Sequence, residues 1–327
     1  MVAPTVAISP VPPWFFPQPA VDMAMLQLVH EEAEVESLSG YVQSYIRDTY
    51  HSFRDIYTDG SKDPESGRAG ASIVVRGVGV GSFWRLTDEV SVYSTEIIAI
   101  AKALEWVEEA RPERVVICSD SASVLSSLQS FRSCRMDILY EVYMYLYQLE
   151  RLGITIKFLW IPAHVGVWGN ERADTLAKKA LERPEPEITL HLGRGEMKVL
   201  VQRAMVKQWQ VIWQRENKGR HLYNIQRKVG REVKVGGNRR DEVVMARMRI
   251  GHTLLNSTQF RTGRRASGKC TWCSCEDETI QHVLFECPKY HSERIQWKTE
   301  LQRVGCTEFN QTTVLGMEGD IRKLTLS

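Results

Sequence analysis

The hydrophobic positions between residues 53 and 183 follow two different periods that alternate along the chain. Short β-branched runs bounded by turn residues predict strands, and apolar residues spaced i, i+3 and i+4 predict helices. In one helical pattern, Ile97, Ile98, Ala101, Leu104 and Val107 share a face. The predicted strands are 53–58, 71–76, 80–86, 115–119 and 154–160, and the predicted helices are 95–110, 122–131, 136–152 and 169–181.

The order of these elements, β-β-β-α-β-α-α-β-α, predicts an α/β fold with a mixed five-stranded sheet and helices on both faces. Gly77 and Gly79 mark a close turn between the second and third strand patterns, so the first three strands should form an antiparallel meander. The run 115–119 is unbroken and rich in β-branched residues, which is typical of a buried central strand.

The flanking segments have other compositions. A helical pattern over 197–217 places Val201, Met205, Trp209 and Trp213 in one stripe, which we expect to be core. The predicted organisation is a proline-rich and acidic connector (1–50), the α/β domain (51–183), a linker marked by prolines (184–196), a basic helical region (197–265), a cysteine-containing segment (266–292) and a C-terminal tail (293–327).

The formal net charge of +2 conceals an uneven distribution. Residues 194–269 hold 19 Lys and Arg against 5 Asp and Glu. Such a block indicates contact with a polyanion such as nucleic acid, although scattered charge is more often a solvated face. No apolar run reaches the roughly 18 residues of a membrane span, and the N-terminus lacks the basic start of a signal peptide. We therefore expect no membrane partner and a location in the cytoplasm or nucleus.

Acidic side chains stand at positions where the predicted elements begin or end. Asp59 and Asp120 follow two strand patterns, Glu96 lies near the start of a helix, and Asp174 lies in the first turns of the last helix. If the two strands are parallel, Asp59 and Asp120 share one edge of the sheet. Each acid alone also has an ordinary interpretation as a turn residue, a helix cap or an ion-pair partner of a lysine such as Lys178.

Carboxylates that converge repel one another unless cations hold them together. Oxygen ligands favour Mg²⁺ or Mn²⁺ over zinc, and two ions about 3.5–4 Å apart can activate water and stabilise the leaving oxygen of a phosphodiester. The pattern therefore predicts a site for two such ions on Asp59, Glu96, Asp120 and Asp174.

Four segments in this order resemble the type 1 ribonuclease H family: IYTDGSK (56–62), STEIIAIAKALEW (94–106), VVICSDSASVL (115–125) and FLWIPAHVGVWGNERADTLAKKA (158–180). The resemblance covers about 130 residues of the chain. It implies that the four acids bind metal and that His164, in a glycine-containing loop, assists proton transfer or product release. An imidazole that titrates near neutrality suits that role.

The resemblance implies hydrolysis of the RNA strand of an RNA–DNA hybrid, which requires recognition of the 2′-OH. Only 40 residues separate Asp120 from Trp160, which resembles family variants without a basic handle, so affinity should come from elsewhere, such as the basic block. Backbone groups at Gly60 and Ser61 and the side chains of Ser94 and Asn170 are weak candidates for substrate contact.

A second group of residues has metal-ligand spacing. Cys270, Cys273, His282 and Cys287 form a CCHC set that suits tetrahedral zinc, although buried cysteines with a chance histidine are an alternative. Cys275 competes with Cys273 for a place in the set. The odd number of cysteines, seven, argues against a disulfide framework and for a reducing compartment.

The sequences ARMRIGHTLLNS (246–257) and ETIQHVLFECP (278–288) resemble the carboxyl-terminal end of non-LTR retrotransposon polyproteins. No Tyr-x-Asp-Asp polymerase motif occurs in the chain. The leading hypothesis is an active endoribonuclease from such a polyprotein. The second is an inactive retroelement remnant that only binds nucleic acid, and the third is a transposase or integrase of the same fold, against which the segments around Glu96 and His164 argue.

Overall fold

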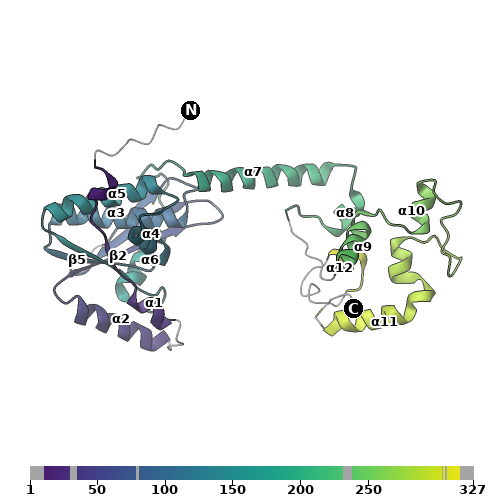
Figure 1. Cartoon of the computed structure of the whole chain (residues 1–327), viewed down its shortest axis with the longest axis horizontal. Helices are drawn as coiled ribbons and strands as arrows, with labels where there is room; N and C mark the ends of the chain where they lie inside the picture. Colours follow the sequence, from purple (N-terminus) through teal and green to yellow (C-terminus); the bar gives the residue numbers. More distant parts are fainter. Residues whose placement is uncertain are drawn as a thin grey trace. The chain divides into compact units, whose positions relative to one another are not determined.

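The computed structural model describes residues 11–29, 35–78, 81–230, 238–303, 305 and 308–316 (Figure 1). It divides into two compact units, residues 1–200 and 201–327, which are described separately. Three features considered in the sequence lie outside the described residues: the first two N-terminal prolines (Pro4 and Pro10), the glutamates at 31, 32 and 34, and Gly79. The described helices include none long and apolar enough to cross a bilayer.

Within the described residues of the first unit, the strands form one mixed sheet of six strands in the order β1-β6-β5-β2-β3-β4. The meander β2-β3-β4 is antiparallel and the pairs β2–β5, β5–β6 and β1–β6 are parallel, which confirms the predicted mixed sheet. The strands are β1 (Ala20–Asp22), β2 (Arg54–Lys62), β3 (Ala69–Val75), β4 (Ser82–Leu86), β5 (Arg114–Ser119) and β6 (Thr155–Trp160).

The sixth strand corrects the predicted count of five. Residues 20–22 come from the segment expected to be a connector, and they pair with the outer edge of β6. Asp22 fixes this strand because its Oδ2 accepts hydrogen bonds from the hydroxyls of Tyr45 (2.7 Å) and Tyr50 (2.8 Å). Phe16 packs against the rings of Phe131 and Tyr143 in the same unit. A strand of three residues is too short to show a period-two pattern, so the sequence carries no signal for it. The strand forms because tertiary contacts hold it in place.

Helices cover both faces of the sheet, as predicted. Alternation along β2 directs Gly60 toward α3 and Tyr57 toward α6, so these two helices lie on opposite faces. Figure 1 shows α5 beside α3, with which it packs. The helices of the unit are the short η1 (Pro13–Phe15), α1 (Ala24–Val29), α2 (Val35–Thr49), α3 (Val92–Ala110), α4 (Ala122–Ser130), α5 (Met136–Arg151) and α6 (Trp168–Ala180).

Small residues allow α6 to approach the sheet closely. A Cβ added to Gly169 would lie 2.2 Å from the Tyr57 ring, and one added to Gly70 would lie 2.6 Å from the Ala177 carbonyl oxygen. The Ser72 hydroxyl donates to the carbonyl of Ala173 at 2.6 Å. These contacts fix the helix on β2 and β3 and thereby place Asp174, the residue after Ala173.

The core of the first unit lies between the sheet and its helices. Strand β5 is buried from Val115 to Ser119, which confirms its predicted central position. Helix α2 also joins this core through Val42 and Ile46, as does Tyr50, the residue that follows the helix. After α6, residues 187–196 return along the domain, where Ile188 bridges to Leu86 on β4. We call residues 187–196 the strap.

Helix α7 (Arg194–Arg215) begins at the end of the strap, and the boundary between the two units falls inside it. The predicted core stripe of this helix is wrong for three of its members, because Val201, Met205 and Trp209 are each more than half exposed. The Trp213 indole does have a partner, since its N–H donates to the Gln226 carbonyl at 3.0 Å.

The second unit has a small core of its own. It is built around Ile225, Met245, Ile280, Leu301 and Leu315. Helix α9 starts with a complete capping box on Asn238 and Asp241. The helices of this unit after α7 are α8 (Arg220–Ile225), α9 (Arg239–Ile250), α10 (Asn256–Arg261), the π-helical η2 (His282–Glu286), the short η3 (Pro288–Tyr290), α11 (His291–Arg303) and α12 (Gln311–Gly316).

Candidate active site

Three of the predicted acids meet at one edge of the sheet. Asp59 lies on β2, Glu96 lies one turn into α3, and Asp120 directly follows β5. One carboxylate oxygen from each lies within 4.8 Å of the others. The parallel register places Asp59 beside Asp120, because Thr58 pairs with Ser119 and each of these two residues is followed by an acid.

Gly60 allows α3 to approach β2 and so brings the third acid, Glu96, to this edge. A Cβ added to Gly60 would lie 2.6 Å from the backbone nitrogen of Glu96 and 2.3 Å from Thr95 Oγ1. Strand β2 therefore contacts the first turn of α3 at a distance that no side chain would permit. One part of the prediction was incomplete, because Asp59 does not end its strand: β2 continues to Lys62, which pairs with Ala69 of β3.

Burial and mutual repulsion both disfavour the charged forms of these acids. Burial, together with the charges of Asp120 and Asp174, raises the pKa of Asp59 to about 7. The pKa of Glu96 is raised well above its ordinary value by burial and by Asp59 and Asp120. Burial raises the pKa of Asp120, although the amide of Asn170 opposes this rise. Such a cluster gains stability from any cation that the oxygens can share.

The donor set fits a hard divalent ion. All the candidate ligand atoms are carboxylate oxygens, which Mg²⁺ and Mn²⁺ prefer. Glu96 Oε2 is buried without a hydrogen-bond partner among the described residues. A buried carboxylate oxygen rarely stays unsatisfied in a protein, so this atom indicates a place for an ion or a water molecule.

Asp174 lies beside this cluster and belongs to a second one. This second cluster consists of His164, Glu171 and Asp174. One ligand atom from each of the three lies within 4.8 Å of the others. Asp174 also accepts a hydrogen bond from Lys178 Nζ at 2.7 Å. The expectation of four acids at one point is thus met by three, with the fourth close enough to raise the pKa of Asp59.

Sequence reasoning missed Glu171. It lies three residues before Asp174 on α6 and therefore on the same helical face, which is the spacing that could have revealed it. His164 is exposed and adopts a left-handed backbone conformation with φ of 55°. Its loop is tied to α2, since the Ser39 hydroxyl donates to the Gly166 carbonyl at 3.1 Å.

The weak candidates for substrate contact occupy different positions. Asn170 is buried, and its Nδ2 donates to Asp120 Oδ2 at 3.1 Å, so it orients an acid. The expectation for Ser94 is corrected: its side chain is fully buried and donates to Glu196 at 2.6 Å. Gly60 packs under α3, whereas Ser61 is half-buried and lies on the same face of β2 as Asp59.

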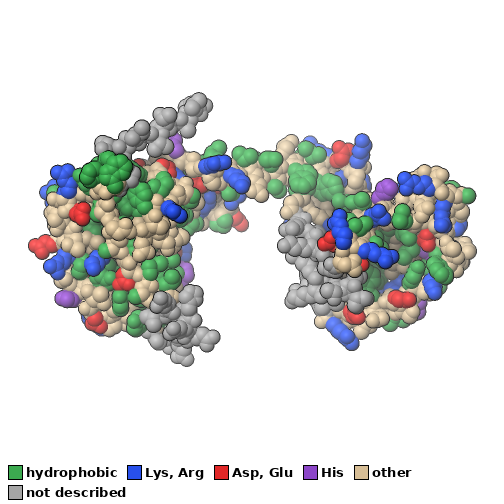
Figure 2. Space-filling model, in the orientation of Figure 1, with side chains coloured by type: hydrophobic (Ala, Val, Ile, Leu, Met, Phe, Trp, Pro, Cys, Tyr) green, Lys and Arg blue, Asp and Glu red, His purple; other side chains and the backbone are tan. Residues whose placement is uncertain are grey.

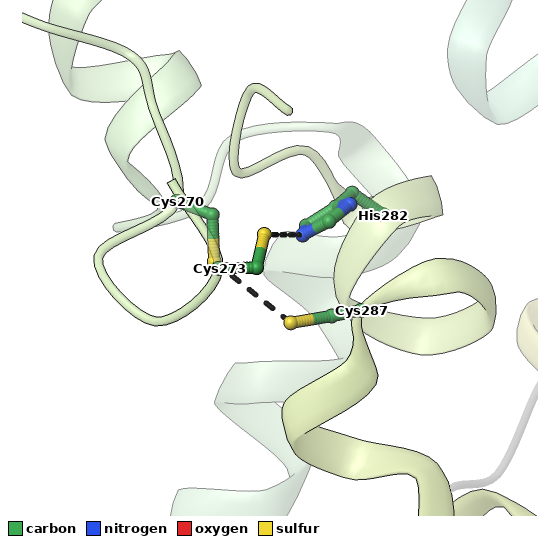
Figure 3. A group of neighbouring side chains, drawn as sticks. All are labelled: Cys270, Cys273, His282 and Cys287. Atoms are coloured by element: carbon green, nitrogen blue, oxygen red, sulfur yellow. Dashed lines mark hydrogen bonds between the residues drawn. The ribbon is translucent and has the colours of Figure 1, made fainter. Parts of the chain in front are cut away.

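The CCHC set also assembles, in the second unit. Figure 3 shows the side chains of Cys270, Cys273, His282 and Cys287 pointing toward one common space. Their ligand atoms all lie within 4.8 Å of one another, with Cys270 Sγ 3.9 Å from Cys287 Sγ and Cys273 Sγ 3.3 Å from His282 Nε2. Two sulfurs on one tetrahedral zinc lie about 3.8 Å apart, so this spacing fits zinc.

The two competing thiols have different positions in the structure. Cys275 is exposed, and its Sγ donates to the Cys273 carbonyl at 3.0 Å instead of joining the cluster. Hydrogen bonds from the backbone of residues 275 and 276 and from nearby side chains lower the pKa of Cys273 to about 7, against the effect of its burial. A thiol that ionises near neutrality is a better metal ligand.

The basic block contains both structural and exposed cations. Arg249 is buried and donates to Leu315 and Gln226, and Arg220 stacks on the rings of Trp213 and Tyr223. The other Lys and Arg side chains of 194–269 that the structure describes are exposed. Figure 2 shows Lys and Arg side chains over the second unit, interspersed with hydrophobic ones.

Comparison with known proteins agrees with this geometry. Residues 52–182 match the profile of the family described as RNase H. The chain is 24% identical over 241 residues to the "Retrovirus-related Pol polyprotein from type-1 retrotransposable element R1" of Popillia japonica, a match that covers 73% of this chain and 88% of the relative. The predicted resemblances to ribonuclease H and to a non-LTR retrotransposon polyprotein are confirmed.

Proposed function

Because residues 52–182 form an RNase H domain in a chain related to a retrotransposon polyprotein, we propose that this chain hydrolyses the RNA strand of RNA–DNA hybrids by two-metal catalysis. The observation that carries the proposal is the convergence of Asp59, Glu96 and Asp120 around a buried, unpartnered carboxylate oxygen. The same observation favours an active enzyme over an inactive remnant, because no acid of the cluster has been replaced by a neutral residue.

We assign the metal ligands to Asp59, Glu96, Asp120 and Asp174. Bound Mg²⁺ or Mn²⁺ would supply an activated water and stabilise the leaving oxygen of the phosphodiester. Asn170 holds Asp120 through its amide, and Lys178 holds Asp174. For Asp174 to act as a ligand, its carboxylate has to release Lys178 and bind the ion, or bind Lys178 and the ion at the same time.

His164 is assigned to proton transfer or product release. It lies on an exposed loop, and its imidazole groups with the carboxylates of Glu171 and Asp174. An exposed imidazole can exchange protons with solvent, and one beside acids can pass a proton to a leaving group. Ser61 is the best remaining candidate for contact with the 2′-OH, because its side chain lies on the face of β2 that carries Asp59.

The test uses the purified full chain, a labelled RNA–DNA hybrid, duplex DNA and Mg²⁺. We expect cleavage of the hybrid but not of the duplex DNA. Asp120→Asn and Glu96→Gln should each reduce cleavage by at least about 100-fold, because a metal ligand is lost. The control is Glu109→Gln, an exposed acid at the other end of α3. Binding of the hybrid without any cleavage would instead support the inactive remnant.

A second proposal concerns zinc on Cys270, Cys273, His282 and Cys287. The support is the mutual distances of their ligand atoms and the burial of three of the four residues. With no metal, the sulfurs of the cysteines and His282 Nε2 would form a polar cluster in a small core, and burying such groups without strong partners is costly. A bound ion would join the loop 270–273 to η2 and so help this unit to fold.

We further propose that the exposed basic side chains of the second unit contact nucleic acid. Trp272 lies between two of the cluster cysteines and is 62% exposed, with Lys289 Nζ 4.8 Å from its ring centre. An exposed aromatic ring beside a cation can stack on an unpaired base while the cation contacts phosphate. Trp272→Ala should weaken binding of single-stranded nucleic acid in a filter-binding assay, and unchanged affinity would contradict this role.

A further inference from the structure

Helix α3, which carries Glu96, begins with half of a capping motif. Its N-cap is Ser91, whose hydroxyl accepts the backbone N–H of Ser94 at 3.2 Å. In a complete capping box, a Glu or Gln at that third helical position accepts the N–H of the N-cap residue in return. Position 94 is a serine, whose side chain is too short for this, so the sequence of the helix leaves the Ser91 N–H without its usual acceptor.

A residue far along the chain completes the motif. Glu196, in the first turn of α7, accepts the backbone N–H of Ser91 at 2.7 Å, and the two residues are 105 positions apart. The same oxygen, Oε1, also accepts the hydroxyls of Ser91 (2.8 Å) and Ser94 (2.6 Å). A negative charge at a helix N-terminus is favourable in its own right.

Glu196 is itself fixed by two further donors. Its Oε2 accepts the backbone N–H of Gly193 at 2.7 Å and Nη1 of Arg135 at 2.8 Å. Arg135 is 3% and Glu196 7% exposed, and both ends of this buried pair are fully hydrogen-bonded. Arg135 also donates to the His191 carbonyl, which ties the strap to the start of α5. A buried pair satisfied in this way holds one defined geometry.

The first turn of α3 is therefore held from two sides. Gly60, the neighbour of Asp59, contacts the backbone at Thr95 and Glu96, while Glu196 holds Ser91 and Ser94. Glu96 is two residues beyond Ser94, so any shift of this turn moves its carboxylate relative to Asp59 and Asp120. Ion sites tolerate misplacement of only about 0.5 Å.

We propose that Glu196 is a positioning residue for the metal-binding cluster, acting through α3 from outside the segment that matches the RNase H family. The proposal rests on the metal site described under the proposed function. Residue 196 lies beyond position 182, where the family match ends, so the strap is an addition to the domain on which its metal site depends.

The experiment measures Mn²⁺ binding to the full chain by electron paramagnetic resonance, with Asp59→Asn defining the binding that belongs to the acidic cluster. Glu196→Gln should weaken this binding by about tenfold, the size of effect typical for a partner of a metal ligand. Half-maximal hybrid cleavage should shift to higher Mn²⁺ by the same factor, while cleavage at saturating Mn²⁺ stays near that of the unaltered chain.

The matched control is Glu187→Gln, because Glu187 lies in the same strap but accepts from the Arg85 backbone and pairs with Arg183, away from α3. It should leave Mn²⁺ binding unchanged. If Glu196→Gln fails to fold, Ser94→Ala removes one donor to Glu196 and should weaken Mn²⁺ binding in the same direction but less.

Unaltered Mn²⁺ affinity in folded Glu196→Gln, or equal losses in Glu196→Gln and Glu187→Gln, would overturn the positioning role. A different result tests the metal site on which the proposal rests. If Asp59→Asn binds as much Mn²⁺ as the unaltered chain, the metal site itself is refuted, and the positioning role with it.

Discussion

Two cysteines only two positions apart have different environments. Cys273 directs its sulfur at His282, while Cys275 is exposed and bonds only to a backbone carbonyl. Spacing alone left both as possible ligands, because it does not give the loop conformation that separates them. In the structure a backbone hydrogen bond from Cys270 to Glu276 closes this loop.

This difference gives a test at the level of single residues. Cys287→Ser should abolish zinc binding and lower the melting temperature of the second unit, because Cys287 is fully buried among the other ligands. Cys275→Ser should retain one zinc per chain. Metal content by plasma mass spectrometry and thermal unfolding of the purified chains provide the measurements. Equal zinc loss in both variants would show that the ligand set is wrong.

Two glycines in the first unit are expected to respond to alanine in opposite directions. At Gly60 the added methyl would meet the backbone of α3, which cannot give way, so Gly60→Ala should destabilise the chain by about 1–3 kcal/mol. Gly40 lies on the exposed side of α2 with no atom within 4 Å of an added Cβ, so Gly40→Ala should stabilise by up to about 1 kcal/mol. Urea unfolding of both variants measures the sign, and a stabilising Gly60→Ala would refute the close contact.

The docking of β1 provides a prediction for pH at the scale of elements. Burial alone would raise the pKa of Asp22, but hydrogen bonds from Ala24, Tyr45 and Tyr50 outweigh it and lower the pKa below the ordinary value of 3.8. A lowered pKa in the folded state stabilises the fold above the unfolded pKa, and the gain disappears as the pH falls through the folded value.

Asp22→Asn should therefore lower the melting temperature at pH 7, with a smaller difference from the unaltered chain at pH 3. Calorimetry at the two pH values gives the comparison. Tyr45→Phe, which removes one of the three donors, should behave in the same way with a smaller effect. If the difference between Asp22→Asn and the unaltered chain is as large at pH 3 as at pH 7, the loss has another cause than the charge of Asp22.

Local patterns predicted most of the elements of the first unit and the acids they carry. Strand β5 and helix α3 have strong periodicities, and Asp59, Glu96 and Asp120 follow from where those elements begin and end. Strand β1, Glu171 and Glu196 were not predicted. Glu171 was missed although its spacing from Asp174 on α6 is local. Strand β1 and Glu196 depend on contacts between distant segments, such as the 105 positions between Ser91 and Glu196, and a local pattern carries no information on such contacts.

The stripe on α7 failed for a related reason. Its apolar residues do follow a helical period, and the helix forms, but periodicity does not say whether a face finds something to pack against. Val201, Met205 and Trp209 are exposed in the structure, so the basic and apolar side chains of this helix are both accessible. The boundary between the two units lies within the same helix, between Leu200 and Val201.

That boundary determines how the contribution of the second unit should be tested. A chain ending at residue 193 would lose Glu196 as well as the basic side chains, so any loss of activity would have two causes. A chain of residues 1–200 keeps the strap, Glu196 and the contacts of Ser91, and removes residues 201–327. Most of the exposed Lys and Arg of the 194–269 block are removed with them.

For residues 1–200 we expect hybrid cleavage to persist at saturating substrate, because the acids and the strap are intact. Binding of the hybrid should be weaker and should depend less steeply on salt, since each lost phosphate contact lowers the slope of log K against log salt by about 0.9 for B-form DNA, and by a similar amount for a hybrid. Fluorescence anisotropy over a range of KCl concentrations measures both quantities. If the salt slope equals that of the full chain, the second unit makes no net phosphate contacts with the hybrid, and its basic side chains are a solvated surface.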